Sequence, residues 1–319
     1  MRSIFLILLF SFFLILLFSL NGICNINSQN MNQNEIKPNG QVVFMTDFGT
    51  RDRFVPSMRG VAMAVEPGLK LHDLTHEIEP FNIWEASYTL AGTIPYWPEG
   101  TVFVSVVDPG VGTDRRSVVA KTSGGKFVVT PDNGTLTLVQ DQIGITDVRV
   151  IDESVNRRPG TEEFATFHGR DGYAYTGARI ASGTIRYEET GPLMNSQIVK
   201  IDYSPAALSE NGNELSGTIA KIEYPYGNPA TNIPAELFNK ANEQDVEIWK
   251  VEIYNGSETV YSESVPFAKS FGYVEQGEPL LYIDSLGNLG LALNEDNFAE
   301  KNKIKAGPGW KIKLSKMNF

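Results

Sequence analysis

One stretch in the first half of the chain, residues 101–116, most constrains the fold. It opens with a nearly unbroken apolar and β-branched run at 102–107, which is typical of a strand buried on both faces of a parallel sheet. A Pro-Gly turn ends the strand. The strand therefore delivers Asp108 to its carboxyl end, where open α/β sheets bind ligands, and the loop that follows adds Arg115.

Two interpretations of this acidic and basic pair are open. Asp108 could cap the turn and form a structural ion pair with Arg115, because Asp residues are common in turns. Alternatively, the pair could serve a ligand site at the end of the strand. The rest of the sequence favours the second interpretation.

Length and composition limit the class of protein. The chain has 319 residues, enough for about two domains. Hydrophobic residues make up 42% and charged residues 20%, so a packed core is expected. The formal net charge of -11 disfavours nucleic acid as a partner, since phosphate binding requires a basic surface.

The first 40 residues are distinct from the rest. Residues 1–24 combine one positive charge with an apolar run at 4–20, which predicts a signal peptide or a membrane anchor. The only cysteine, Cys24, follows this run and could carry a lipid. We therefore expect an exported or membrane-anchored protein that contacts the membrane only through this segment. A lipoprotein would be attached through Cys24. Residues 25–40 are rich in Asn and Gln and predict a flexible tether.

The folded part divides into two predicted domains. Residues 41–200 alternate strands with helices, which predicts an α/β domain with a mostly parallel sheet. Residues 214–316 form short alternating segments separated by turns, which predicts a small all-β barrel domain, and 204–213 is expected to be a linker. The expected strands of the first domain lie at 41–45, 69–74, 102–107 and 127–130, and its expected helices at 55–65, 84–94 and 172–182, the last capped by Asp171 and Gly183.

Histidines are the other candidates for chemistry. His72 and His76 have the spacing of metal ligands on a helix, but this segment is expected to be a strand, in which residues four apart are too distant to share a metal. No metal site is predicted, and a metal-dependent hydrolase that uses this pair stays as an alternative. His168 lies in a loop before a helix, where it could approach Asp108. The sequence contains no serine nucleophile elbow, P-loop or convincing dinucleotide fingerprint.

Several short motifs occur in a consistent order over residues 41–315, and together they resemble the S-adenosyl-L-methionine hydroxide adenosyltransferase family, which is related to the adenosyl-fluoride and adenosyl-chloride synthases. In the first domain they are Thr46-Asp-Phe-Gly-Thr-Arg-Asp52, Asp73-Leu-Thr-His76, Trp97-Pro-Glu-Gly-Thr101, Asp108-Pro-Gly-Val-Gly-Thr-Asp-Arg-Arg116, Pro131-Asp-Asn-Gly134 and Phe167-His-Gly-Arg-Asp171. In the second domain they are Tyr224-Pro-Tyr-Gly-Asn-Pro-Ala-Thr-Asn-Ile233 and Asp284-Ser-Leu-Gly-Asn288.

The resemblance implies a fold, an assembly and a reaction. It implies an α/β domain joined to a β-barrel, a homotrimer, and a substrate bound between the first domain of one subunit and the second domain of its neighbour. The implied reaction is hydrolysis of S-adenosyl-L-methionine to adenosine and L-methionine, with no separate cofactor and no metal.

The same resemblance assigns roles to individual positions. Asp108, Arg115 and His168 match the catalytic set of the family. The positions that match substrate contacts are Asp47, which would hold the ribose hydroxyls, Asp52, Phe81, Glu223, Asn228, Ser285 and Asn294. Two of these depart from the halogenating relatives, because Glu223 replaces an Asp and Phe81 replaces a Trp that stacks on adenine.

Alternatives to hydrolysis are also open. A carboxylate at position 108 would repel a halide nucleophile, so water is expected rather than fluoride or chloride. A halide-using member of the superfamily and a non-catalytic, exported protein that binds nucleosides or S-adenosylmethionine are the alternatives.

Overall fold

The computed structural model describes residues 36–243 and 246–317. Within these two ranges no helix is both long enough and apolar enough to cross a membrane. The predicted signal peptide or anchor at 1–24, with Cys24, lies outside the described residues, as does most of the predicted tether. The tether's last two residues are hydrogen-bonded to the folded chain: the Asn39 amide donates to Glu99 O, and Gly40 N donates to Ala181 O.

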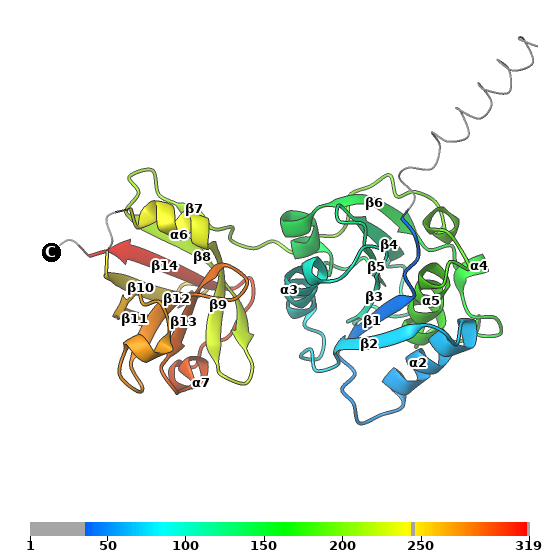
Figure 1. Cartoon of the computed structure of the whole chain (residues 1–319), viewed down its shortest axis with the longest axis horizontal. Helices are drawn as coiled ribbons and strands as arrows, with labels where there is room; N and C mark the ends of the chain where they lie inside the picture. The colour runs from blue at the N-terminus through cyan, green and yellow to red at the C-terminus, as the bar shows by residue number, and fades with distance from the viewer. Residues whose placement is uncertain (1–35, 244–245, 318–319) are drawn as a thin grey trace, which may run out of the picture. The chain divides into compact units, whose positions relative to one another are not determined.

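In the described part of the first domain, six strands form one sheet in the order β2-β1-β3-β5-β4-β6 (Figure 1). Four of them, β2, β1, β3 and β5, are mutually parallel, whereas β4 is antiparallel to both β5 and β6. The predicted mostly parallel sheet is therefore confirmed. The strands are β1 (Gln41–Thr46), β2 (Lys70–Thr75), β3 (Val102–Val106), β4 (Ser117–Thr122), β5 (Phe127–Pro131) and β6 (Ile145–Val150).

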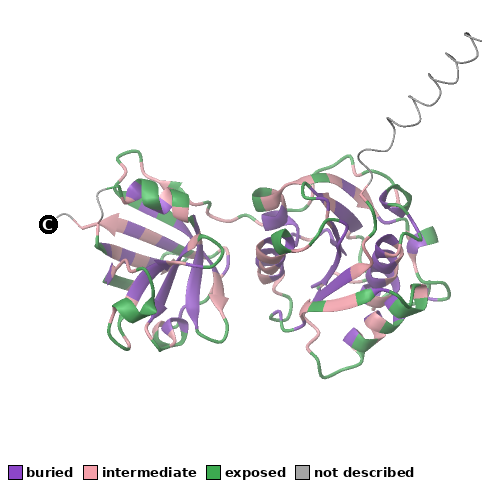
Figure 2. Cartoon of the chain, in the orientation of Figure 1, coloured by how far each residue is buried: buried purple, intermediate pink, exposed green. Residues whose placement is uncertain are grey.

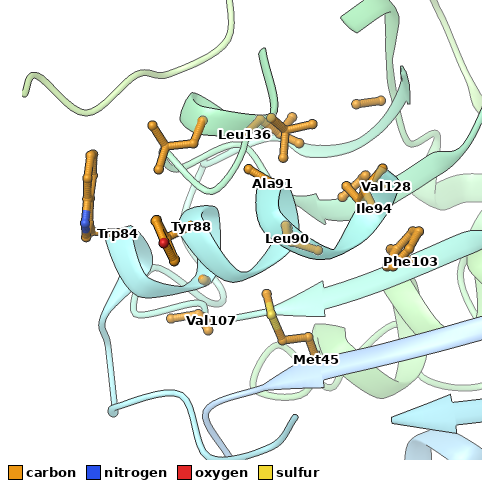
Figure 3. Packing of buried hydrophobic residues seen from close by; sticks show 14 of the residues in the cluster. Met45, Trp84, Tyr88, Leu90, Ala91, Ile94, Phe103, Val107, Val128 and Leu136 are labelled. Atoms are coloured by element: carbon orange, nitrogen blue, oxygen red, sulfur yellow. The ribbon is translucent and has the colours of Figure 1, made fainter. Parts of the chain in front are cut away.

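Helices cover both faces of this sheet, as the apolar run in β3 requires (Figures 1 and 2). On one face α3 (Ile83–Thr93) packs its apolar side against Met45, Phe103 and Val107 (Figure 3). On the other face α5 (Tyr175–Ala181) approaches β3 so closely that a Cβ at Gly177 would lie 2.6 Å from Val104. The other α-helices in the described part of this domain are α2 (Phe54–Val65) and α4 (Glu153–Asn156).

One predicted helix begins earlier than expected. The segment before α5 is a π-helix at Gly169–Ala174, and His168 is its N-terminal flanking residue. Asp171 is therefore inside the helix and does not cap it, so this part of the prediction was wrong. Its carboxylate instead accepts hydrogen bonds from the Arg170 side chain at 2.8 and 2.7 Å.

The second sheet is antiparallel and barrel-like. In the described residues the strand order is β11-β10-β14-β8-β9-β13-β12. A β-bridge between Phe267, which follows β11, and Leu281 of β12 links the first and last strands of this order. A core that includes Trp249, Phe238 and Phe298 fills the interior. The strands are β7 (Ala207–Leu208), β8 (Glu214–Glu223), β9 (Asn228–Pro234), β10 (Ile248–Asn255), β11 (Glu258–Pro266), β12 (Pro279–Ile283), β13 (Asn288–Leu293) and β14 (Trp310–Lys316).

Two expectations for this half need correction. The prediction of an all-β domain was incomplete, because α6 (Ala235–Ala241) and α7 (Phe298–Asn302) place Phe238 and Phe298 in the core. The predicted linker at 204–213 contains β7, which pairs with β8. For the two helices, burial of these phenylalanine side chains stabilises a short helical segment.

Candidate active site

Two carboxylates emerge together at one edge of the first sheet. Asp47 directly follows β1 and Asp108 lies just beyond β3, and these strands are parallel neighbours in which Thr46 pairs with Val106. Asp47 Oδ2 accepts a hydrogen bond of 2.9 Å from Phe81 N. Burial raises the pKa of Asp47 above its usual range, the Phe81 hydrogen bond opposes the rise, and the negative charge of Asp108 adds to it.

Asp108 and Arg115 form the ion pair that the loop sequence suggested. Arg115 Nε donates to Asp108 Oδ1 at 2.8 Å and Nη2 donates to Oδ2 at 2.5 Å, a two-point contact that fixes the plane of the carboxylate. Only 4% of the Asp108 side chain is exposed. Burial alone would lower the pKa of Arg115, but the hydrogen bond with Asp108 and nearby negative charge raise it, so this guanidinium stays charged.

His168 joins this pair from a distant part of the chain. Its Nδ1 lies 3.1 Å from Arg115 Nη2, and its Nε2 lies 3.5 Å from Arg157 Nη1. Burial lowers the pKa of His168, and the two guanidiniums lower it further against the opposing charges of Glu153 and Asp108. His168 is therefore held in its neutral form, and its Nδ1 is placed to accept a hydrogen bond from Arg115.

The structure adds residues that sequence reasoning missed. Glu153 Oε1 lies 3.8 Å from His168 Nδ1, and Glu153 Oε2 accepts a 2.6 Å hydrogen bond from Arg157. Tyr173, buried in the π-helix, donates to Asp108 Oδ2 at 3.4 Å. The i,i+4 spacing of Glu153 and Arg157 is a sequence signal for a helix pair, but it does not indicate that the pair faces His168.

This arrangement predicts opposite pKa shifts for two substitutions beside His168. Glu153→Gln removes a negative charge and should lower the pKa of His168 further, whereas Arg157→Met removes a positive charge and should raise it. Because the neutral ring is the form above the pKa, Glu153→Gln extends neutral His168 to lower pH. NMR titration of the three histidine rings measures this directly, with His168→Gln assigning the signal. Shifts in the same direction would contradict the geometry.

The other two residues predicted on this domain lie differently. Phe81 is 70% exposed and has a left-handed backbone with φ of 70°, and its backbone N–H donates to the Asp47 carboxylate. A left-handed backbone is costly for an aromatic residue and marks a constrained position. Asp52 is exposed and its carboxylate contacts the adjacent Arg53 at 2.5 Å through the backbone N–H, so the structure does not bring it to Asp108.

The four candidates on the second domain share one cavity of about 1040 Å³. Its lining includes Glu223, Asn228, Ser285 and Asn294, which come from the ends of β8, β9, β12 and β13. Burial and the negative charge of Asp284 raise the pKa of Glu223, and its Oε2 accepts a 3.4 Å hydrogen bond from the Tyr282 hydroxyl. A carboxylate-lined cavity of this size suits a ligand that carries a cationic group.

The described residues thus divide the predicted site into two groups. Asp47, Phe81, Asp108, Arg115 and His168 belong to the α/β domain, and none of them lines the cavity of the barrel-like domain, whose described lining residues run from Glu223 to Asn297. Each group offers side chains that could bind a different part of one substrate.

The two histidines considered as metal ligands have different partners. His72 Nε2 lies 2.6 Å from Gln41 Oε1, whereas His76 Nδ1 lies 2.9 Å from Thr46 Oγ1. In the described ranges no group of three or more His, Cys, Asp or Glu side chains is placed to hold a metal ion. The geometry therefore does not favour the alternative of a metal-dependent hydrolase based on this pair.

Comparisons with known proteins match both domains. Residues 42–191 match the N-terminal domain, and residues 217–311 the C-terminal domain, of SAM hydroxide adenosyltransferase. The chain is 34% identical to the (R)-S-adenosyl-L-methionine hydrolase of Methanocaldococcus jannaschii over 80% of this chain and 89% of that protein. It is 27% identical to a fluorinase of Actinopolyspora mzabensis, over 86% of this chain and 97% of that protein.

A solved structure gives the same result. An uncharacterized conserved protein from Thermotoga maritima superposes with a TM-score of 0.75 and 32% identity, covering 86% of this chain and 99% of that one. The family expected from the motifs is thereby confirmed, and the chain belongs to the SAM hydroxide adenosyltransferase family.

Proposed function

We propose that this protein hydrolyses S-adenosyl-L-methionine to adenosine and L-methionine by in-line attack of water on C5′. The observation that carries the proposal is the convergence of Asp108, Arg115 and His168 in a member of this family. These residues are separated by up to 60 positions in the sequence and meet at the sheet edge where ligands of α/β folds bind.

The reaction needs little from the protein beyond placement of one water. The sulfonium is already activated, because the electron pair of the C5′–S bond returns to sulfur and methionine leaves as a neutral thioether. The new C5′–O bond forms as this bond breaks, and the water gives up one proton. Holding the water in line supplies several kcal/mol, and a positioned base contributes a further ~10²–10⁴-fold.

We assign a role to each member of the edge group, which consists of Asp47, Phe81, Asp108, Arg115 and His168 of the α/β domain. Asp108 orients the water and accepts its proton, and the two-point contact with Arg115 fixes this carboxylate. Neutral His168 accepts a hydrogen bond from Arg115 and so completes the network of Asp108, Arg115 and His168. Asp47 has one carboxylate oxygen free of the Phe81 hydrogen bond, with which it can bind the ribose hydroxyls, and the exposed Phe81 ring can stack on adenine.

The four candidates that line the cavity of the barrel-like domain form the cavity group, which would hold the rest of the substrate, including its methionine part. Asn228, Ser285 and Asn294 offer amide and hydroxyl groups, and Glu223 offers a negative charge for the methionine ammonium group. We further propose a homotrimer in which the α/β domain of one subunit and the cavity of its neighbour form each site, without a separate cofactor. Residues 1–24, in this proposal, direct export or anchor the protein in a membrane.

A product assay tests the function and separates its alternatives. Purified protein incubated with S-adenosyl-L-methionine should release adenosine and methionine in equal amounts, and added fluoride or chloride should not yield a 5′-halogenated adenosine. A carboxylate at position 108 would repel a halide at the position of the water. A halogenated product would favour the halide-using alternative, and binding without product would favour the non-catalytic one.

A further inference from the structure

The motif Asp73-Leu-Thr-His76 lies outside both groups of site residues, yet its buried His76 contacts Thr46, the residue that precedes Asp47. A bulge in the β1–β2 pairing shifts the register, so that Phe44 pairs with Asp73 but Met45 pairs with Thr75. Counting on by one residue sets His76 beside Thr46 at the end of β1. The bulge therefore places an imidazole where regular pairing would place a threonine.

His76 is 4% exposed and has a partner at each ring nitrogen. Nδ1 lies 2.9 Å from Thr46 Oγ1. Nε2 lies 3.0 Å from Asp73 Oδ1, a close electrostatic contact that is not aligned as a hydrogen bond, and Asp73 is in turn paired with Arg59. The contacts run from α2 across β2 to the end of β1.

The proton positions follow from the Thr46 hydroxyl. Thr46 is fully buried, and its oxygen accepts a 3.2 Å hydrogen bond from Phe48 N. Its own proton is satisfied if it donates to His76 Nδ1, which assigns the ring proton to Nε2, beside Asp73. Burial and the charge of Arg59 lower the pKa of His76, in agreement with a neutral ring.

This chain of contacts fixes the two residues that follow Asp47. Thr46 Oγ1 holds Phe48 N, and the His76 carbonyl accepts a 2.7 Å hydrogen bond from Gly49 N. Gly49 has φ of 63°, a conformation that glycine adopts without strain. The backbone on the carboxyl side of Asp47 is thereby tied to β2, which determines where its carboxylate points.

We infer that His76 is a positioning residue for Asp47, acting through Thr46 and the 47–49 loop to set the carboxylate that selects ribose. The inference rests on the proposed function, because the ligand of Asp47 is the ribose of the adenosyl group. His76 itself touches no substrate atom in this account. Its loss should therefore impair recognition of the ribose hydroxyls more than the chemical step.

The test is the affinity ratio of adenosine to 2′,3′-dideoxyadenosine, measured by calorimetry on the full chain. Wild-type protein should prefer adenosine by on the order of tenfold or more, since hydrogen bonds to a charged group are strong. Asp47→Ala should remove this preference. His76→Leu should lower the ratio by on the order of tenfold, whereas His76→Asn, whose amide oxygen can replace Nδ1 as acceptor, should restore most of it.

Matched variants separate positioning from general damage. His72→Leu changes the histidine within β2, which contacts Gln41, and should leave the ratio unchanged. Thr46→Val removes the same hydroxyl link with little change of shape and should lower the ratio as His76→Leu does, which gives a second reading if the leucine variant folds poorly. A loss of stability alone would weaken the binding of both nucleosides equally and leave the affinity ratio unchanged.

The outcomes distinguish this inference from the proposed function. An unchanged ratio in His76→Leu and Thr46→Val, with the ratio lost in Asp47→Ala, would overturn the inference and leave the function intact. A wild-type protein that binds neither nucleoside would overturn both.

Discussion

Replacing Asp108 with Asn should reduce hydrolysis of S-adenosyl-L-methionine by ~10²–10⁴-fold, the contribution of a positioned general base. The amide has nearly the shape of the carboxylate but cannot accept the proton of the attacking water. It can still accept one hydrogen bond from Arg115, so the loop should keep its conformation. Steady-state kinetics and adenosine affinity, measured together, should show a large loss in kcat and little change in binding.

The control for this variant lies in the same loop. Asp114→Asn removes an equal charge from an exposed side chain and should leave kcat close to wild type. Thermal unfolding of both variants shows whether the fold is retained. Near-normal turnover by a folded Asp108→Asn variant would show that the ion pair is structural, which was the other interpretation of the loop sequence.

The parts of the fold that the sequence predicted are those in which local pattern and burial agree. β3 is buried at every position, and its apolar run is visible without any knowledge of tertiary structure. β4 and β6 were not identified, because their place depends on antiparallel pairing with β5 and with each other. In β6 only one of six positions is buried, so its sequence carries little hydrophobic signal.

The same division holds for the active site. Asp47 and Asp108 could be placed at a common edge because the carboxyl ends of parallel strands coincide. The approach of His168 to Arg115 depends on a π-helix that begins at Gly169, three residues before the helix that the sequence predicted. Glu153 and Arg157 escaped detection because α4 is four residues long, and its orientation is determined by packing rather than by its own sequence.

Two inactive variants with lesions in different domains should restore activity when they assemble together. Asp108→Asn disables the edge group, and Glu223→Lys places a cation in the cavity that would receive the methionine ammonium group. If each site combines two subunits, a mixed trimer contains sites in which both halves are intact. In a mixed trimer of either composition one of the three sites has both halves intact, so we expect about a third of wild-type activity.

Co-expression with two different tags, followed by purification on both, isolates the mixed assemblies and ensures that subunits have combined. The matched control pairs Asp108→Asn with Arg115→Ala: both lesions lie in the α/β domain, so no combination of subunits yields an intact edge group. A site contained within one chain predicts no recovery from either pair, because every chain then carries a damaged site. Recovery confined to the first pair would therefore establish that neighbouring subunits share the site, and its absence in doubly purified assemblies would place both groups in a single chain.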